Sequence, residues 1–246
     1  MQLEICLDDI DGARIADRAG ADRIELCADL SVGGITPSIG TVAQALNEIK
    51  SVGLQVLIRA RGGDFTYSPS EVSAMCADIS AIRSLPNPHN IRIGFVVGAL
   101  TPANTIDLDT IAQFKAAAGD SPLTFHKAFD LTSDLHAALN QLIELGFQRV
   151  LTSGGKASAL EGAAVIKELV AQSAGRMAIL AGGGVRAHNL AEIIAATGVT
   201  ELHMTARQEV ASSAQPSEVS GLYDSGKRWV TSESMISEIQ QAISAH

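Results

Sequence analysis

The chain has 246 residues, of which 46% are hydrophobic, 18% are charged and only 4% are aromatic. This composition excludes a disordered chain and predicts a large core that is filled mainly by aliphatic side chains. The formal net charge of −9 argues against nucleic acid or an anionic membrane surface as a partner, because both bind basic patches.

Short apolar runs alternate with longer segments of helical periodicity along the whole chain. The predicted strands cover residues 2–6, 23–27, 55–60, 91–97, 123–127, 149–152, 178–182 and 201–205. The predicted helices cover residues 9–19, 39–51, 69–84, 107–118, 134–145, 158–173, 187–196 and 232–244.

These strand–helix cycles fit either an open doubly wound sheet or a closed (β/α)8 barrel. The first turn, residues 7–11, lacks the glycine-rich phosphate cradle of a dinucleotide-binding fold. The number of cycles, the length and the charged residues within strands favour an α/β TIM barrel in which residues 1–246 form a single domain. Residues 206–231 are rich in serine and long for a βα loop, so we expect an extension over the barrel mouth.

The N-terminus, the lengths of the apolar stretches and the number of cysteines indicate the cellular compartment. The N-terminus lacks a basic start followed by an apolar run, and no apolar stretch is long enough to span a bilayer. Three cysteines do not make a disulfide framework, so reduced thiols in the cytoplasm are the simple interpretation.

Charged residues and thiols recur inside two predicted strands. Glu4 and Cys6 lie two residues apart, as do Glu25 and Cys27, so each pair shares one face of its strand. We expect that face to be the barrel interior, close to the C-terminal rim where such barrels place their active sites. A buried carboxylate is costly unless it is paired, so positive partners should lie nearby.

Five basic side chains are candidates for those partners. Arg59, at the end of the third strand, and Arg61 just after it are expected on one face, His126 with Lys127 beside it ends the fifth strand, and His203 lies in the eighth. Two interpretations stay open: a self-satisfied layer of buried ion pairs, or a site that binds a ligand.

Three loops point to an anion. Small residues follow the third, sixth and seventh strands, and their backbone N–H groups can approach a ligand closely. The candidate anion-binding residues in these loops are Asp64, Gly154, Gly183 and Gly184, together with Thr152 at the end of the sixth strand. Tight strand-to-helix turns would explain the same glycines without any ligand.

The cysteines suggest a soft metal. Cu(I) prefers thiolate and thioether ligands, and neighbouring first and second strands could bring Cys6 and Cys27 together. No closely spaced metal-capture motif is present, so buried packing residues are the alternative.

Six motifs in register resemble the CutC family, which is named for copper homeostasis. They lie at residues 3–6, 20–27, 33–38, 59–65, 124–130 and 149–154. The resemblance implies a (β/α)8 barrel, a cytoplasmic location, a homodimer or higher homo-oligomer, and copper (Cu⁺) bound by Cys6 and Cys27. Relatives often carry two serines where this chain has Met204 and Thr205.

Three functional hypotheses follow. The resemblance implies a Cu(I)-binding protein of copper tolerance or trafficking. The residue chemistry favours an enzyme acting on a small phosphate- or carboxylate-bearing metabolite, with Glu25, Arg61 and His126 as catalytic residues. In it, Glu4, Arg59 and His203 would belong to the binding site. A scaffold barrel that assembles through residues 206–231 is the third.

Overall fold

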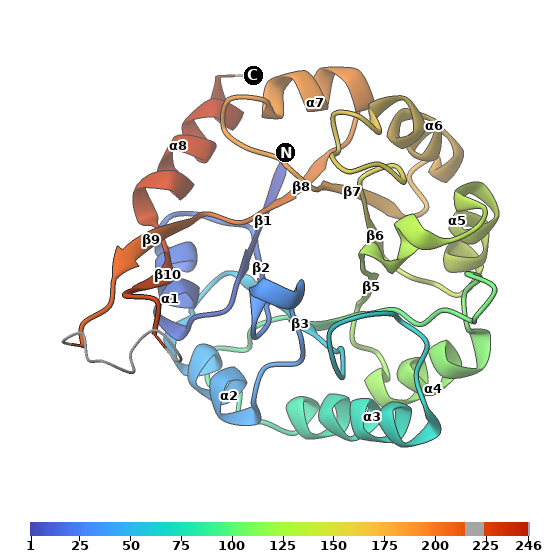
Figure 1. The fold of residues 1–246 in the computed structure, drawn as a ribbon, viewed down its shortest axis with the longest axis horizontal. Helices are drawn as coiled ribbons and strands as arrows, with labels where there is room; N and C mark the ends of the chain where they lie inside the picture. The colour runs from blue at the N-terminus through green and yellow to red at the C-terminus, as the bar shows by residue number, and fades with distance from the viewer. Residues whose placement is uncertain (215–223, 246) are drawn as a thin grey trace.

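The computed structural model describes residues 1–214 and 224–245, and in it eight parallel strands close into a barrel in chain order (Figure 1). The strands are β1 (Gln2–Leu7), β2 (Arg23–Leu26), β3 (Gly53–Leu57), β4 (Ile93–Val97), β5 (Leu123–Phe125), β6 (Arg149–Thr152), β7 (Ala178–Gly182) and β8 (Glu201–Met204). The predicted TIM barrel is thereby confirmed.

Eight α-helices in the described residues alternate with these strands and form the outer ring seen in Figure 1. They are α1 (Ile10–Arg18), α2 (Ile39–Glu48), α3 (Pro69–Arg83), α4 (Leu108–Ala118), α5 (Leu135–Glu144), α6 (Ala163–Ser173), α7 (Leu190–Thr197) and α8 (Glu233–Ser244). Most begin at a polar N-cap. At α3, for example, Ser68 and Glu71 form a reciprocal capping box.

The closure between β1 and β8 decides which strand residues meet in the interior. Cys6 is opposite Glu25 of β2, and Glu4 is opposite His203 of β8. The intervening Ile5 is fully buried in the main hydrophobic core. The alternation therefore sends polar side chains into the barrel and aliphatic ones into the layer beneath the helices.

The segment after β8 forms an antiparallel hairpin of β9 (Arg207–Ala211) and β10 (Lys227–Thr231). This hairpin stands outside the ring of strands beside α1 (Figure 1), where the hydroxyl of Thr231 donates a hydrogen bond to Asp9. Residues 215–223 of the expected extension lie outside the described part of the chain.

No helix in residues 1–214 or 224–245 combines the length and the apolar character that crossing a bilayer requires.

Candidate functional site

A cavity of about 180 Å³ lies at the C-terminal end of the barrel strands. Its lining combines acidic, basic, thiol and apolar side chains. The lining residues are Cys6, Glu25, Leu30, Gly33, Leu57, Arg59, Phe65, His126, Lys127, Leu151, His203 and Thr205. Titratable groups with perturbed pKa values in one cleft of this kind are typical of a functional site.

Two thiols meet beneath this cavity. The Sγ atoms of Cys6 and Cys27 are 3.8 Å apart, and both side chains are buried. Ligand atoms of Cys6, Glu25 and His203 all lie within 4.8 Å of one another, and Cys27 adjoins this group of three through its contact with Cys6.

Burial and neighbouring groups raise the pKa values of Cys6 and Glu25 in this cluster. The hydrogen bond with Cys27, the loss of solvent and the charge of Glu25 raise the pKa of Cys6 well above 9.0. Burial also raises the pKa of Glu25, although the nearby His203 opposes that shift.

His203 is held in place from below by Glu4. Nδ1 of His203 lies 2.7 Å from Glu4 Oε1, and its Nε2 lies 3.8 Å from Glu25 Oε2. Burial alone would raise the pKa of Glu4, but Arg23 and His203 outweigh it and lower the pKa to about 2. Burial would lower the pKa of His203, but Glu25 and Glu4 raise it.

The Glu4 side chain continues into an ion-pair layer towards the N-terminal end of the barrel. Arg23 donates hydrogen bonds to Glu4 and to Glu201, the latter at 2.6 Å. Arg149 donates to the same Glu201 oxygen at 2.9 Å. Arg23, rather than a residue after β3, is therefore the main basic partner of the buried acids.

Of the two arginines after β3, only Arg59 lines the cavity. Its guanidinium donates to the carbonyl oxygens of Val32, Gly34 and Gly63 at 2.8–2.9 Å, and it stacks 4.7 Å from the ring centre of Phe65. No carboxylate of the described residues forms an ion pair with it.

Arg61 points away from the cavity. It donates to Glu71 of α3 at 2.7 Å and to Asp64 at 3.1 Å, and Asp64 is exposed. The structure thus brings Arg61 and Asp64 together as a surface ion pair that orders the β3–α3 loop.

The loop after β6 is filled by a carboxylate of the protein itself. Asp130 accepts hydrogen bonds from the hydroxyl of Thr152, from the N–H and hydroxyl of Ser153, and from the N–H of Gly155. Gly154 has a packing role, because a Cβ there would lie 2.5 Å from the carbonyl oxygen of Gly162. Asp130 occupies the donors that an external anion would need.

The glycines after β7 lie next to the cavity without lining it. Gly183 and Gly184 have φ values of 101° and 71°, which favour glycine. A Cβ at Gly183 would lie 3.2 Å from Nζ of Lys127. The absence of a side chain therefore leaves room for this lysine at the cavity wall.

His126 is the neutral member of the cavity. Its Nδ1 accepts a hydrogen bond from the N–H of Ala128 at 3.2 Å, so the proton resides on Nε2, which has no partner among the described residues. Burial, helped by the charge of Arg59, lowers the pKa of His126 to about 3.

Arg23 and Glu201 were not predicted from the sequence as members of the site, and Phe65 was given no role. A signal for the first two was present, since Arg23 precedes Glu25 by two residues and Glu201 precedes His203 by two. The same alternation that placed Glu25 and His203 in the interior also applies to them.

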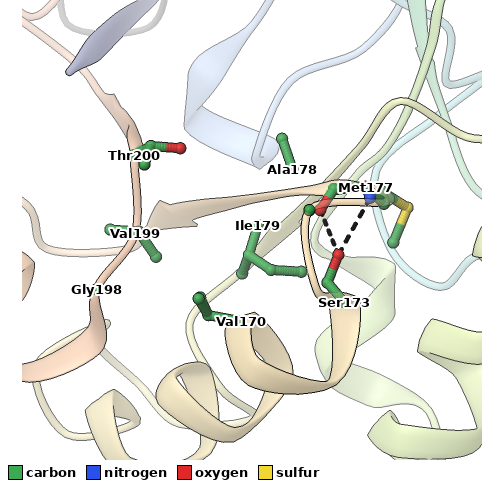
Figure 2. Close-up of a pocket in the computed structure, with 9 residues that line it drawn as sticks. Val170, Ser173, Met177, Ala178, Ile179, Gly198, Val199 and Thr200 are labelled. Carbon is green, nitrogen blue, oxygen red and sulfur yellow. Dashed lines mark hydrogen bonds between the residues drawn. The ribbon is translucent and has the colours of Figure 1, made fainter.

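A second pocket, of about 240 Å³, lies at the opposite end of the barrel between α6 and the start of β7 and β8 (Figure 2). Figure 2 shows Val170 and Ile179 beside Ser173, whose hydroxyl is hydrogen-bonded to the backbone of Met177. None of its nine lining residues is titratable, so it offers no acid–base chemistry.

Similarity to known proteins agrees with this architecture. The family model described as "CutC family" matches residues 1–208. The chain belongs to the CutC family. A CutC family protein of Pasteurella multocida is 46% identical over 84% of this chain and 82% of its own length. A human protein named copper homeostasis protein cutC homolog is 45% identical over 83% of this chain and 73% of its own length.

A solved structure extends the likeness to three dimensions. The crystal structure of a CutC described as a putative copper homeostasis protein from Streptococcus agalactiae has a TM-score of 0.76 and 37% identity. It covers 82% of this chain and 97% of the Streptococcus chain. In this CutC chain the family model ends within β9, so the rest of the hairpin and α8 lie beyond it.

Proposed function

We propose that this CutC protein binds one Cu(I) ion through Cys6 and Cys27 and acts in copper homeostasis. The observation that carries this proposal is the pair of buried thiols 3.8 Å apart at the base of the cavity. A metal–thiolate bond of about 2.3 Å, as in zinc sites, lets two sulfurs at this separation contact one ion without moving apart.

The donor set suits Cu(I) better than a hard cation. Cu(I) is a soft ion that favours thiolate ligands, whereas Mg²⁺ and Ca²⁺ require several oxygen ligands. Among the residues that the structure describes, this cluster holds a single carboxylate, that of Glu25, and burial raises its pKa. Nε2 of His203 is a third candidate donor, because Nδ1 is already engaged with Glu4.

Copper in this role is cargo rather than a resident cofactor, and we propose a cytosolic setting for it. The three cysteines are all unpaired thiols in this structure, as a reducing compartment requires. The homodimer implied by the family remains a prediction.

The test is an anaerobic Cu(I) titration against a chromogenic chelator. The wild type should retain one Cu(I) per chain, and Cys6→Ser and Cys27→Ser should each lose most of the affinity. Cys76→Ser is the matched control, because Cys76 lies on α3 away from the cavity and should bind copper like the wild type. Undiminished binding by the Cys6→Ser/Cys27→Ser double variant would refute the proposal.

A further inference from the structure

The cavity is larger than a single metal ion requires. Its volume of about 180 Å³ is many times the ~10–15 Å³ that one water needs. Cys6, Glu25 and His203 line only part of it, and the remaining walls differ from them in chemistry. The charge and the apolar character of those walls indicate what kind of second ligand would fit.

One wall holds two cationic side chains, and only Lys127 has a carboxylate partner. Arg59 is 6% exposed and is satisfied only by neutral carbonyl oxygens, while its Nε has no hydrogen-bond partner in the described residues. Lys127 is partly exposed and forms an ion pair with Asp130 at 3.8 Å, although Asp130 also accepts hydrogen bonds from the β6 loop. The buried charge of Arg59 has no counter-charge among the described residues, and such a charge is costly, so this wall is complementary to an anion.

The remaining walls are apolar. Leu30, Leu57, Phe65 and Leu151 line the cavity beside the cationic wall. An inorganic anion would gain nothing from them, whereas an organic anion would bury its hydrocarbon part there. His126 adds an Nε2–H donor that has no partner among the described residues. Because the ring is uncharged, it can donate a hydrogen bond to an oxygen atom of the ligand but cannot form an ion pair with it.

A phosphate group fits this wall less well than a carboxylate. The N–H groups of the β6 loop, which could serve a phosphate, already donate to Asp130. The glycines after β7 do not line the cavity. Because Asp130 already offsets the charge of Lys127, the uncompensated charge of Arg59 and the neutral donor of His126 match the single charge and the two oxygens of a carboxylate.

We propose that this cavity binds a small organic carboxylate. Its charged end lies beside Arg59 and Lys127, and its apolar end lies against the leucine and phenylalanine side chains. Cys6 lines the same cavity, but the carboxylate contacts proposed here use neither Cys6 nor Cys27 and do not depend on metal binding.

The probe is isovalerate, with isovaleramide as its neutral counterpart of the same shape. Calorimetry on the metal-free protein should give saturable binding of isovalerate with a Kd on the order of 1 mM. Isovaleramide and inorganic phosphate should each bind at least about tenfold more weakly, since each lacks one half of the complementarity. In an NMR titration, the imidazole N–H signal of His126 should shift with isovalerate.

Variants decide whether the cationic wall is responsible. Lys127→Met should weaken isovalerate binding about tenfold, whereas Lys156→Met, an exposed lysine outside the cavity, should leave it unchanged. The Cys6→Ser/Cys27→Ser variant should bind isovalerate like the wild type, which separates this proposal from the copper proposal. Equal binding of acid and amide, an unaffected Lys127→Met, tighter binding of phosphate, or no saturation would each overturn it.

Discussion

Glu4 of β1 and His203 of β8 are joined by a 2.7 Å contact between Oε1 and Nδ1 across the seam where the barrel closes. The first and last strands of the barrel are therefore linked by a side-chain pair as well as by backbone pairing. Because Nδ1 is engaged with a carboxylate, the ring is oriented so that Nε2 faces Glu25. Glu4 thus belongs to the support of the site, one layer below the cavity.

Removing the charge of Glu4 should destabilise the fold. Glu4→Gln leaves Arg23 buried with only Glu201 as an acidic partner, and we expect a loss of about 3 kcal/mol in the free energy of unfolding. The measurement is the free energy of unfolding of both proteins from urea denaturation at pH 7.

The control for this substitution makes the same chemical change on the surface. Glu209→Gln breaks an exposed ion pair with Lys227 in the hairpin, and its cost should stay below about 1 kcal/mol. Similar losses for the two variants would contradict the structural role given to Glu4.

Gly98, directly after β4, is required by the ring of His126. A Cβ at this position would lie 2.4 Å from Cε1 of His126, so Gly98→Ala must displace the imidazole from the cavity wall. We expect a loss of about 1–3 kcal/mol from overpacking, measured by thermal and urea unfolding.

Gly40→Ala is the matched control for that prediction. Its added Cβ approaches only Ser38, at 3.8 Å, inside α2, where alanine is favoured over glycine by up to about 1 kcal/mol. A Gly98→Ala protein as stable as Gly40→Ala would show that the ring has more room than the structure gives it.

The interior of the barrel was largely predictable because strand residues obey a period of two. Glu4, Cys6, Glu25 and Cys27 all face inward as that period requires. The strand ends were less predictable, since β3 stops at Leu57 and the period no longer applies to the residues that follow.

The two arginines after β3 illustrate that limit. Arg59 turns into the cavity and Arg61 turns towards Glu71 of α3, although both were expected on one face. Likewise, no local pattern could indicate that Asp130 would fill the β6 loop, because that contact joins two loops 22 or more residues apart.

The β6 loop should depend on the acceptor capacity of Asp130. Asp130→Asn turns one accepting oxygen into an NH₂ group that faces the N–H of Ser153 or Gly155, so a loss of about 1–3 kcal/mol is expected. Faster amide hydrogen exchange at Ser153 and Gly155 should accompany it. Asp64→Asn, on an exposed carboxylate, should change stability by less than about 1 kcal/mol, and equal effects would argue against the role of Asp130.

The buried neutral His126 should make the fold sensitive to acid. Its pKa is lowered from 6.5 to about 3, so between these values the unfolded chain binds a proton that the folded protein does not. The contribution of neutral His126 to the free energy of unfolding is therefore fully present above pH 6.5 and declines as the pH falls towards 3. Between pH 7 and pH 5.5 this amounts to about 1 kcal/mol.

The measurement is the pH dependence of the urea-unfolding free energy for wild type and His126→Asn. Asparagine keeps an acceptor for the N–H of Ala128 but does not titrate, so the variant should lose about 1 kcal/mol less than the wild type on acidification to pH 5.5. The raised pKa of His203 acts in the opposite direction, since its stabilisation is present below pH 6.5 and fades at higher pH. Because His203 is present in both proteins, its effect cancels in the difference. Parallel pH profiles would mean that His126 takes up its proton in the folded state.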